Sequence, residues 1–332
     1  MSHGCNESTS RDHRIQMMKT LWSLFAFGLA LGAQAADYAY VTNQGDHTVS
    51  VVDLQRKQVV KRIQVGKAPV GVAVDQRHQK VYVSNVEGRS LSVIDMQRQQ
   101  VTQTFALPIA PVGLAVNKEG DRLYVADWYH DTLMVIAAQD GQVIAQVQVG
   151  QAPGGLQLSQ DGTILYVANR DSNDVSVIDT ASNQERQRIK VGQHPFGLSV
   201  SPDGRWLFVV NVYSNSVSLV DTRTDKVETT LPVGDHPYCA TTDALGKRLY
   251  VTNTGEDSVS VIDLASSKAI ARVRVPGSPE GIAYDAVHQQ ILVASWMDNV
   301  LAVIDGERLI LKPAIKVGSQ PRAFGQFVGH TE

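Results

Sequence analysis

Cysteine is scarce in this sequence, because the 332 residues contain only two, Cys5 and Cys239. Cys5 lies in an N-terminal leader that we expect to be removed, so the mature chain keeps one thiol and cannot form an intrachain disulfide. The chain also lacks a Cys-x-x-Cys-His haem attachment sequence, a zinc-ligand spacing, an EF-hand loop, a P-loop and a Gly-x-Ser-x-Gly elbow. No motif therefore requires an enzyme, and whether the protein is one stays open.

An excess of positive charge is also missing. The chain has 30 basic and 33 acidic residues, and removing the leader leaves the acidic residues in the majority. This balance disfavours attraction to nucleic acid, and the aromatic residues are not interleaved with a basic run of the kind that binds it. We therefore expect that nucleic acid is not a partner.

Long hydrophobic runs are rare as well. The apolar run near the N-terminus, Leu21 to Leu31, is too short to cross a bilayer core of about 30 Å. It follows Met17-Met18-Lys19 and precedes Ala33-Gln34-Ala35, which is the arrangement of a secretory signal with a small-residue cleavage site. We expect residues 1–35 to be leader and signal peptide, and residues 36–332 to be one exported domain, periplasmic or secreted, without a transmembrane anchor.

The dominant feature that is present is a repeat. Tyr40-Val-Thr-Asn43 returns 42 residues later as Tyr82-Val-Ser-Asn85. The further copies are Tyr124-Val-Ala-Asp127, Tyr166-Val-Ala-Asn169, Phe208-Val-Val-Asn211, Tyr250-Val-Thr-Asn253 and Leu292-Val-Ala-Ser295. Each period holds four β-type segments, A to D in chain order, as in the unit with Gly71–Asp75, Lys80–Val86, Ser90–Met96 and Val101–Leu107. Four strands in about 42 residues are the signature of a β-propeller blade.

A proline recurs at the same interval, and proline suits the first residue of a strand because it has no N–H to donate. The positions are Pro69, Pro111, Pro153, Pro195, Pro237, Pro279 and Pro321. Each should mark the passage from outer strand D of one blade to inner strand A of the next. We therefore predict an all-β, seven-bladed propeller with four-stranded antiparallel blades. Strand A from the C-terminus, Arg322 to Val328, should pair with the N-terminal strands B, C and D and close the ring.

Strand C ends in aspartate in six blades, where the carboxylate can cap the C–D turn. These residues are Asp53, Asp95, Asp179, Asp221, Asp263 and Asp305. The exception, Ala137, is followed by Asp140-Gly141, which can turn the chain there. Cys239 stands where five blades have glycine two residues after the proline, which indicates a buried small residue and not a nucleophile.

The irregular residues of the repeat fall mainly on one surface, which we call the loop face. Strands alternate in direction within a blade, so the B–C loops and the D–A linkers lie together on this face. The B–C loops carry Arg89, Trp128, Tyr129, His130, Arg170, Tyr213, Glu256 and Trp296. The D–A linkers carry His194, Phe196, His236, Tyr238, Glu280 and Arg322. A constant framework with one variable rim is typical of a recognition surface, although packing against the neighbouring blade is an equally open role for Trp128 and Trp296.

The Tyr-Val-Thr-Asn repeats, the Ser-Val-Ile-Asp strand and the Val-Gly-x-x-Pro-x-Gly linker together resemble the YVTN-family β-propellers, also called YncE-like proteins, over the mature chain. At fold level that family resembles the propellers of methylamine dehydrogenase heavy chains, haem d1 nitrite reductases, nitrous oxide reductase and propeller lactonases. The resemblance implies a non-catalytic exported protein with a surface, binding or accessory role, and it does not choose among these.

His194 and His236 occupy equivalent positions on adjacent blades, each just before a proline and close to Phe196 or Tyr238. Two imidazoles at one channel mouth could ligate a metal or haem iron, or change charge near neutral pH, and the likeness to haem d1 propellers favours the first use. The same position holds Ala68, Ala110, Ala152, Ser278 and Gln320 in the other blades. Ordinary linker residues therefore remain the alternative interpretation.

The first functional hypothesis is a non-catalytic binding or scaffold protein that holds a protein partner or a small ligand on the loop face and needs no cofactor. Tryptophan, tyrosine, arginine and histidine are the residue types that supply binding anchors. The rival hypothesis is a redox, quinoprotein or haem-associated accessory protein, or a metal-dependent propeller lactonase. A lactonase would need a divalent metal on oxygen ligands such as Glu256, Glu280 and the repeated asparagines.

The leader gives the first testable prediction. Expression of the full chain in a Gram-negative host should release a mature protein that begins at Ala36, because signal peptidase cuts after the small residues at 33–35. Intact-mass measurement of the periplasmic fraction checks this. A cytoplasmic product that retains residues 17–35 would contradict it.

Overall fold

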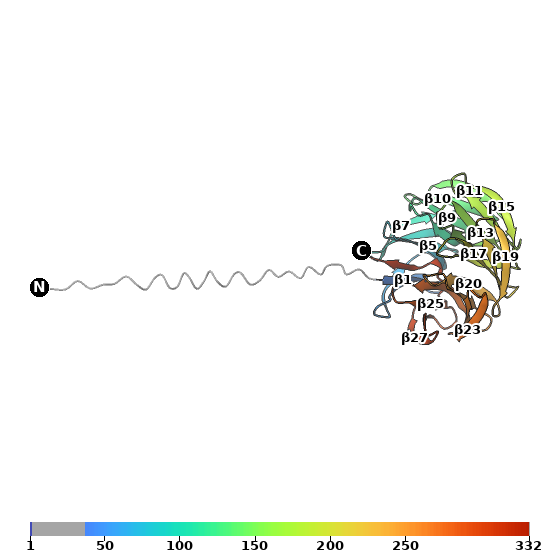
Figure 1. The fold of residues 1–332 in the computed structure, drawn as a ribbon. Coiled ribbons are helices and arrows are strands. Elements are labelled where there is room, and N and C mark those ends of the chain that lie inside the picture. The colour runs from blue at the N-terminus through green and yellow to red at the C-terminus, as the bar shows by residue number, and fades with distance from the viewer. Residues whose placement is uncertain (2–36, 332) are drawn as a thin grey trace. The chain divides into compact units, whose positions relative to one another are not determined.

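The computed structural model describes Met1 and residues 37–331 (Figure 1). The predicted signal peptide and its cleavage site thus lie outside the described residues, apart from Met1. The described part of the chain is built from strands and turns and contains no helix. Within it there is accordingly no helical segment that could span a bilayer.

Seven blades, each a sheet with four antiparallel strands, form a ring, and the strand roles repeat from blade to blade (Figure 1). The innermost strands A are β4 (Pro69–Asp75), β8 (Pro111–Val116), β12 (Pro153–Leu158), β16 (Pro195–Val200), β20 (Pro237–Thr242), β24 (Pro279–Asp285) and the closing pair β28 (Phe324–Gln326) and β29 (Val328–His330). Strands B are β1 (Asp37–Asn43), β5 (Lys80–Asn85), β9 (Arg122–Asp127), β13 (Ile164–Asn169), β17 (Trp206–Asn211), β21 (Arg248–Asn253) and β25 (Gln290–Ser295). Strands C are β2 (Thr48–Asp53), β6 (Ser90–Asp95), β10 (Thr132–Ala137), β14 (Asp174–Asp179), β18 (Ser216–Asp221), β22 (Ser258–Asp263) and β26 (Val300–Asp305). Strands D are β3 (Gln58–Gln64), β7 (Gln100–Ala106), β11 (Val143–Gln148), β15 (Gln184–Lys190), β19 (Lys226–Pro232), β23 (Lys268–Arg274) and β27 (Leu311–Lys316).

The predicted all-β, seven-bladed propeller with four antiparallel strands in each blade is confirmed. The four segments predicted from the unit that starts at Gly71 match β4 to β7 to within two residues at each end. Each recurring proline that begins an inner strand also pairs with the last residue of strand B, as Pro69 does with Asn85. The prolines therefore mark the passage between blades, as their spacing predicts.

The strand sequences follow from where each strand lies. In β14 the side chains of Val175, Val177 and Ile178 are fully buried, because neighbouring blades cover both faces of the sheet. In the outer strand β15 Ile189 is the one fully buried side chain, and polar residues occupy the peripheral positions. Apolar β-branched residues thus concentrate in the inner three strands, where burial stabilises them most.

The ring is closed by the two chain ends, as predicted, but the closing strand is not one continuous segment. Pro321 bridges Asn43, and β29 pairs with β1 so that Val328 lies opposite Ala39. Between these two contacts β28 turns aside and runs parallel to β4 of the next blade. The predicted strand from Arg322 to Val328 is therefore wrong in its bounds, and its main pairing with β1 begins only at Val328.

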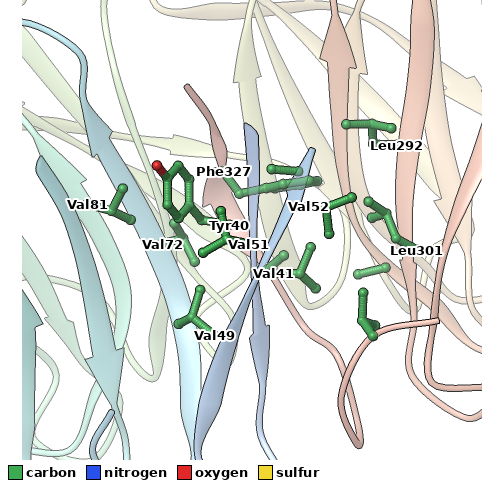
Figure 2. Packing of buried hydrophobic residues seen from close by; sticks show 14 of the residues in the cluster. Tyr40, Val41, Val49, Val51, Val52, Val72, Val81, Leu292, Leu301 and Phe327 are labelled. Carbon is green, nitrogen blue, oxygen red and sulfur yellow. The ribbon is translucent and has the colours of Figure 1, made fainter. Parts of the chain in front are cut away.

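The reason for the break is the length of the closing segment. In the next blade Val74, which pairs with Val81, lies five positions after Pro69, whereas Val328, which pairs with Ala39, lies seven positions after Pro321. Gly325 absorbs the surplus with a φ of 102°, in a region that residues with a side chain rarely adopt. The detour still buries Phe327, which is fully inaccessible and packs in the cluster that contains Tyr40 and Val72 (Figure 2).

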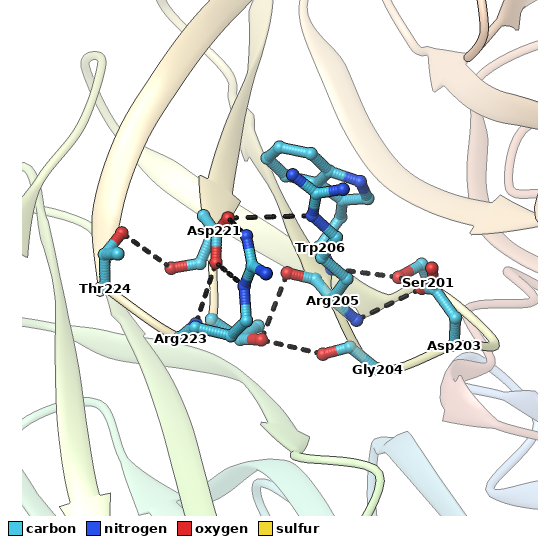
Figure 3. Close-up of polar contacts among 9 residues, drawn as sticks. Ser201, Asp203, Gly204, Arg205, Trp206, Asp221, Arg223 and Thr224 are labelled. Atoms are coloured by element: carbon cyan, nitrogen blue, oxygen red, sulfur yellow. Dashed lines mark hydrogen bonds and ion pairs between the residues drawn. The ribbon is translucent and has the colours of Figure 1, made fainter.

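The turns on the face opposite the loop face confirm the predicted aspartate caps. Asp221, at the end of β18, accepts a hydrogen bond from the backbone N–H of Arg223 at 2.9 Å (Figure 3). The Arg223 side chain also binds this carboxylate, and these contacts hold the pKa of Asp221 well below its usual range. In the exceptional blade Asp140 accepts from the N–H of Gln142 at 3.0 Å, so the turn after Ala137 is made as the sequence predicts.

A buried asparagine at the end of strand B binds side chains of strand C in five blades, and in three of them, at Asn43, Asn211 and Asn253, it also binds the D–A linker. The Asn211 side-chain amide donates to the hydroxyls of Ser216 and Ser218, at 3.2 and 2.9 Å, and both serines lie in strand C. Its carbonyl oxygen accepts the backbone N–H of Gly192 in the preceding D–A linker at 3.1 Å. One fully buried side chain of strand B thus binds both strand C and the linker.

This tie gives a stability prediction. Asn211→Ala leaves two buried hydroxyls and one linker N–H without their partner, so the free energy of unfolding should fall by roughly 2–3 kcal/mol. Ser295→Ala is the matched control, because Ser295 is equally buried at the same repeat position and its hydroxyl has no partner. Urea unfolding followed by circular dichroism measures both. Equal losses in the two variants would contradict the role given to the asparagine.

Candidate functional site

The B–C loops and D–A linkers meet on one face, and they are fastened to each other by a repeated hydrogen bond. The backbone N–H of His194 donates to the Asn173 side chain at 2.8 Å, and that of His236 donates to Asn215 at 3.0 Å. Both histidines have left-handed backbones, with φ of 52° and 47°. The loop face is therefore a stiff frame, and it holds both imidazoles on fixed backbone positions.

The structure brings the two histidines together through Tyr213. The His194 ring stacks on the Tyr213 ring with centroids 4.0 Å apart, and the His236 ring meets it edge-on at 5.7 Å. The Nδ1 atom of His194 is buried without a hydrogen-bond partner, and its nearest carboxylate oxygen, on Asp171, is 3.8 Å away. His236 Nδ1 lies 3.0 Å from a carboxylate oxygen of Asp235, and about half of its side chain is exposed.

Three aromatic rings close the inner side of this site. Phe196 contacts Tyr238 and Phe324, with ring centroids 4.4 and 5.1 Å apart, and Tyr238 contacts Phe324 at 5.4 Å. Trp128 packs against the outer side of Phe196 at 6.3 Å. Burial raises the pKa of Tyr238 far above its usual range, so its hydroxyl stays protonated at every physiological pH.

Two arginines border the aromatic rings. The Arg170 guanidinium lies over Trp128 at 5.3 Å and over Tyr213 at 6.0 Å, distances at which cation–π attraction operates. The Arg322 guanidinium lies over Trp296 at 5.4 Å and over Phe324 at 5.9 Å. Trp128 and Trp296 thus serve the candidate site as flat supports for cations, beyond any packing role in their own blades.

Arg322 also forms the most buried ion pair of the loop face. Its Nη1 donates to both carboxylate oxygens of Glu280, at 2.6 and 2.7 Å, and its Nε donates to the Gln44 side chain at 2.8 Å. Glu280 is 8% exposed. Burial raises the pKa of Glu280, and the nearby Arg322 charge opposes that rise. The pair depends on both partners, because an isolated buried charge is costly.

These residues surround two adjoining cavities on the loop face, and His236, Tyr238 and Thr254 line both. The first, of about 290 Å³, is completed by Trp128, Arg170, Phe196, Val212 and Tyr213. The second, of about 280 Å³, is completed by Gly255, Ser278, Glu280, Trp296 and Arg322. Phe196 also lines the central channel, a cavity of about 670 Å³ bounded by the inner strands. Its ring therefore separates the channel from the first loop-face cavity.

Not every predicted residue belongs to this site. His194 lines neither loop-face cavity and is joined to the first only by stacking on Tyr213. Arg89, Tyr129, His130 and Glu256 also line neither cavity. His130 Nδ1 lies 2.6 Å from the buried carboxylate of Asp127 in its own loop. Glu256 accepts from the Ser258 hydroxyl and from Arg272, at 2.7 and 3.1 Å. These side chains support their own loops, and the sequence does not reveal which way a loop side chain turns.

Sequence reasoning missed Phe324, Val212 and Thr254. Their positions in the repeat carry a usable signal, since Val212 and Thr254 directly follow the buried asparagines, as Trp128, Arg170 and Trp296 follow their counterparts. Cys239 also differs from its prediction in one respect, because it is only partly buried and lines the central channel. Burial still raises the pKa of its thiol far above the usual range, which keeps it in the unreactive form.

Among residues 37–331, no three histidine, cysteine, aspartate or glutamate side chains converge as a metal-binding group. The donor set of the loop face instead consists of single imidazoles, flat aromatic rings and guanidinium groups. Such a set suits a planar ligand that carries acidic substituents more than a free metal ion.

The ion pair gives a pH-dependent prediction. Arg322→Gln leaves the Glu280 carboxylate buried without its counter-ion, which should cost roughly 3 kcal/mol of unfolding free energy near neutral pH. Without Arg322 the folded pKa of Glu280 lies above its unfolded value, so stability is retained at low pH and is lost as pH rises through the folded pKa. Urea unfolding at pH 5 and pH 8 should show the larger loss at pH 8.

The matched control for this experiment is the double variant Glu280→Gln/Arg322→Gln. It removes both charges, so it should recover much of the lost stability and lose the pH dependence. A single variant as stable as the wild type at both pH values would show that the pair contributes nothing.

Comparisons with known proteins support the fold, and one family match includes residues of the candidate site. Residues 72–164 match the YNCE-like beta-propeller family, and residues 125–241 match the Cytochrome D1 heme domain. No curated protein matches the sequence. Similar solved structures include the hydrazine synthase of Kuenenia stuttgartiensis, 23% identical over 76% of this chain and 87% of that chain, with a TM-score of 0.69.

Two further structures have the same fold. A functionally unknown protein from Desulfotomaculum acetoxidans is 14% identical over 87% of this chain and 99% of that chain, with a TM-score of 0.75. Dihydro-heme d1 dehydrogenase NirN, solved in complex with DHE, is 17% identical over 86% of this chain and 74% of that chain, with a TM-score of 0.67. The repeat and the closed ring make the chain a seven-bladed β-propeller, and the family match over residues 72–164 supports a YncE-like one.

Proposed function

We propose that the protein binds a haem-type tetrapyrrole on its loop face and serves as a haem-associated accessory protein outside the cytoplasm. One observation carries the proposal. The segment that matches the Cytochrome D1 heme domain, residues 125–241, supplies every residue of the first loop-face cavity except Thr254. The cavity and the sequence likeness thus coincide in the same stretch of chain.

The residues present fit such a group. A tetrapyrrole is flat and apolar with acidic substituents, and Trp128, Tyr213 and Tyr238 offer aromatic surface to it. Arg170 stands above two of these rings, where its guanidinium can reach an acidic substituent. His194 lies outside the cavity and supports its wall, because the His194 ring stacks on that of Tyr213.

Each side chain then has a definite role. The Phe196, Tyr238 and Phe324 rings provide the inner wall and exclude water from that side. His236 lines both cavities, and the Asp235 carboxylate next to its Nδ1 leaves Nε2 available to a ligand. The bound group would supply a redox-active iron. The two arginines, each already beside a carboxylate, set the orientation of acidic substituents more than the overall affinity.

A protein-binding scaffold is the second candidate, and the exposed apolar residues of the B–C loops favour it. Tyr129, Tyr213 and Met297 are 71%, 52% and 64% exposed at the same repeat position in three blades. Exposed aromatic and methionine side chains are typical anchors for a partner. Affinity capture from a periplasmic extract tests this role, and repeated recovery of no partner would count against it.

The double variant His194→Ala/His236→Ala tests haem-type binding. Titration of the wild type with haemin, followed by absorbance, should show saturable binding. The double variant should bind at least tenfold more weakly, because it loses the His236 imidazole that lines both cavities and the His194 ring that stacks on Tyr213. The melting temperature should hardly change, since alanine adopts the same left-handed backbone at the equivalent positions Ala68 and Ala152, with φ of 52° and 51°.

The control is His130→Ala, which removes a loop-face imidazole that lines neither cavity and should leave haemin affinity unchanged. Absence of saturable haemin binding to the wild type would refute the proposed function. Equal binding by the wild type and the double variant would move the site away from the two histidines.

A further inference from the structure

We infer that ligand binding on the loop face and closure of the ring are thermodynamically coupled through the C-terminal segment, residues 321–331. This inference rests on the proposed function and adds a conformational role for the chain ends. Whatever occupies the second cavity touches a segment that also completes the propeller, so occupancy and closure should favour each other.

The first observation is that the closing segment supplies part of the site. Arg322 lines the second cavity, and Phe324 forms one side of the aromatic inner wall. Gln44, which directly follows the N-terminal strand β1, holds the Nε of Arg322. The two chain ends therefore meet inside the candidate site, whereas every other blade brings its site residues on continuous chain.

The second observation is that Arg322 and Ala323 also bind β1 near the loop face. We call this contact between the C-terminal segment and β1 the seam. The backbone N–H of Arg322 donates to the Thr42 carbonyl at 3.0 Å, and the N–H of Ala323 donates to the Thr42 hydroxyl at 2.8 Å. The Arg322 carbonyl accepts the N–H of Gly281 at 3.1 Å, which links the segment to the preceding blade. Separation of the seam would carry Arg322 and Phe324 out of the site together.

The third observation is that this seam is less regular than the blades beside it. Its inner strand pairs with β1 over three residues, Val328 to His330, and at one bridge from Pro321. In the next blade the pairing of β4 with β5 is interrupted only between Pro69 and Val72. The interruption at the seam, from Pro321 to Val328, is longer, so this blade is the expected site of local opening.

Glu280 makes opening costly in a way that a ligand can modulate. Its buried carboxylate is neutralised by Arg322, which belongs to the closing segment. An open seam leaves that carboxylate without a counter-ion. A ligand that contacts Arg322 binds the closed ring only, and a ligand that binds one state of an equilibrium stabilises that state by mass action.

The direct experiment uses the wild-type protein with haemin as the probe. Hydrogen exchange measured by mass spectrometry should show that saturating haemin slows exchange of peptides covering residues 322–330 at least fivefold. A peptide from β14, which is far from the seam, should exchange at the same rate with and without haemin. No variant is needed, so misfolding cannot confuse the result.

A matched pair of variants tests the reverse effect, that of a weakened seam on haemin affinity. Phe327→Leu weakens the seam from within the core, because Phe327 is fully buried there and lines neither loop-face cavity. Phe208→Leu makes the same change at an equally buried position in β17, away from the seam. Haemin affinity should fall at least threefold in Phe327→Leu and stay at the wild-type value in Phe208→Leu, at similar melting temperatures.

The outcomes separate the two proposals. If haemin binds but leaves exchange of residues 322–330 unchanged, or if both variants bind as the wild type does, the coupling is wrong and the proposed function stands. If haemin fails to bind the wild type, both are wrong. Slower exchange at the seam together with a selective loss of affinity in Phe327→Leu supports the coupling.

Discussion

Three blades hold the loop face by the same buried side-chain amide, at Asn43, Asn211 and Asn253. Asn211 joins two serines of the neighbouring strand to the N–H of a linker, and Asn43 and Asn253 make the same three contacts in their blades. Because strand B, strand C and the linker are joined in this way, the residue that follows each of these asparagines starts from the same backbone position. The side chains there can change in size and charge without disturbing the frame.

Against this constant frame the site arises from asymmetry. Positions just after the recurring proline carry Val70 and Val112 on one side of the ring, but Phe196, Tyr238, Glu280 and Arg322 on the other. Gly154 lies at the transition, and a Cβ there would meet the Phe196 ring at 2.9 Å. Absence of a side chain in one blade thus lets the ring of the next blade lie across the mouth.

The fold was predictable from sequence because the repeat occurs seven times, once in each blade, so one irregular copy does not change the prediction. Closure by the chain ends followed from where the repeat starts and stops, but the detour through β28 did not, because two surplus residues have no pattern. The same limit applies to the site. Equivalence of His194 and His236 is visible in their spacing, whereas their shared contact with Tyr213 depends on side-chain directions that periodicity does not encode.

The Phe196 ring limits how a ligand can move between the loop face and the central channel. The central channel ends against Phe196 and Phe324, and the first loop-face cavity begins on the other side of Phe196. With Tyr238 these rings touch one another, so no aperture of molecular size remains among them. A molecule in the first loop-face cavity therefore cannot pass between these three rings into the channel, and it leaves through the opening on the loop face by which it arrived.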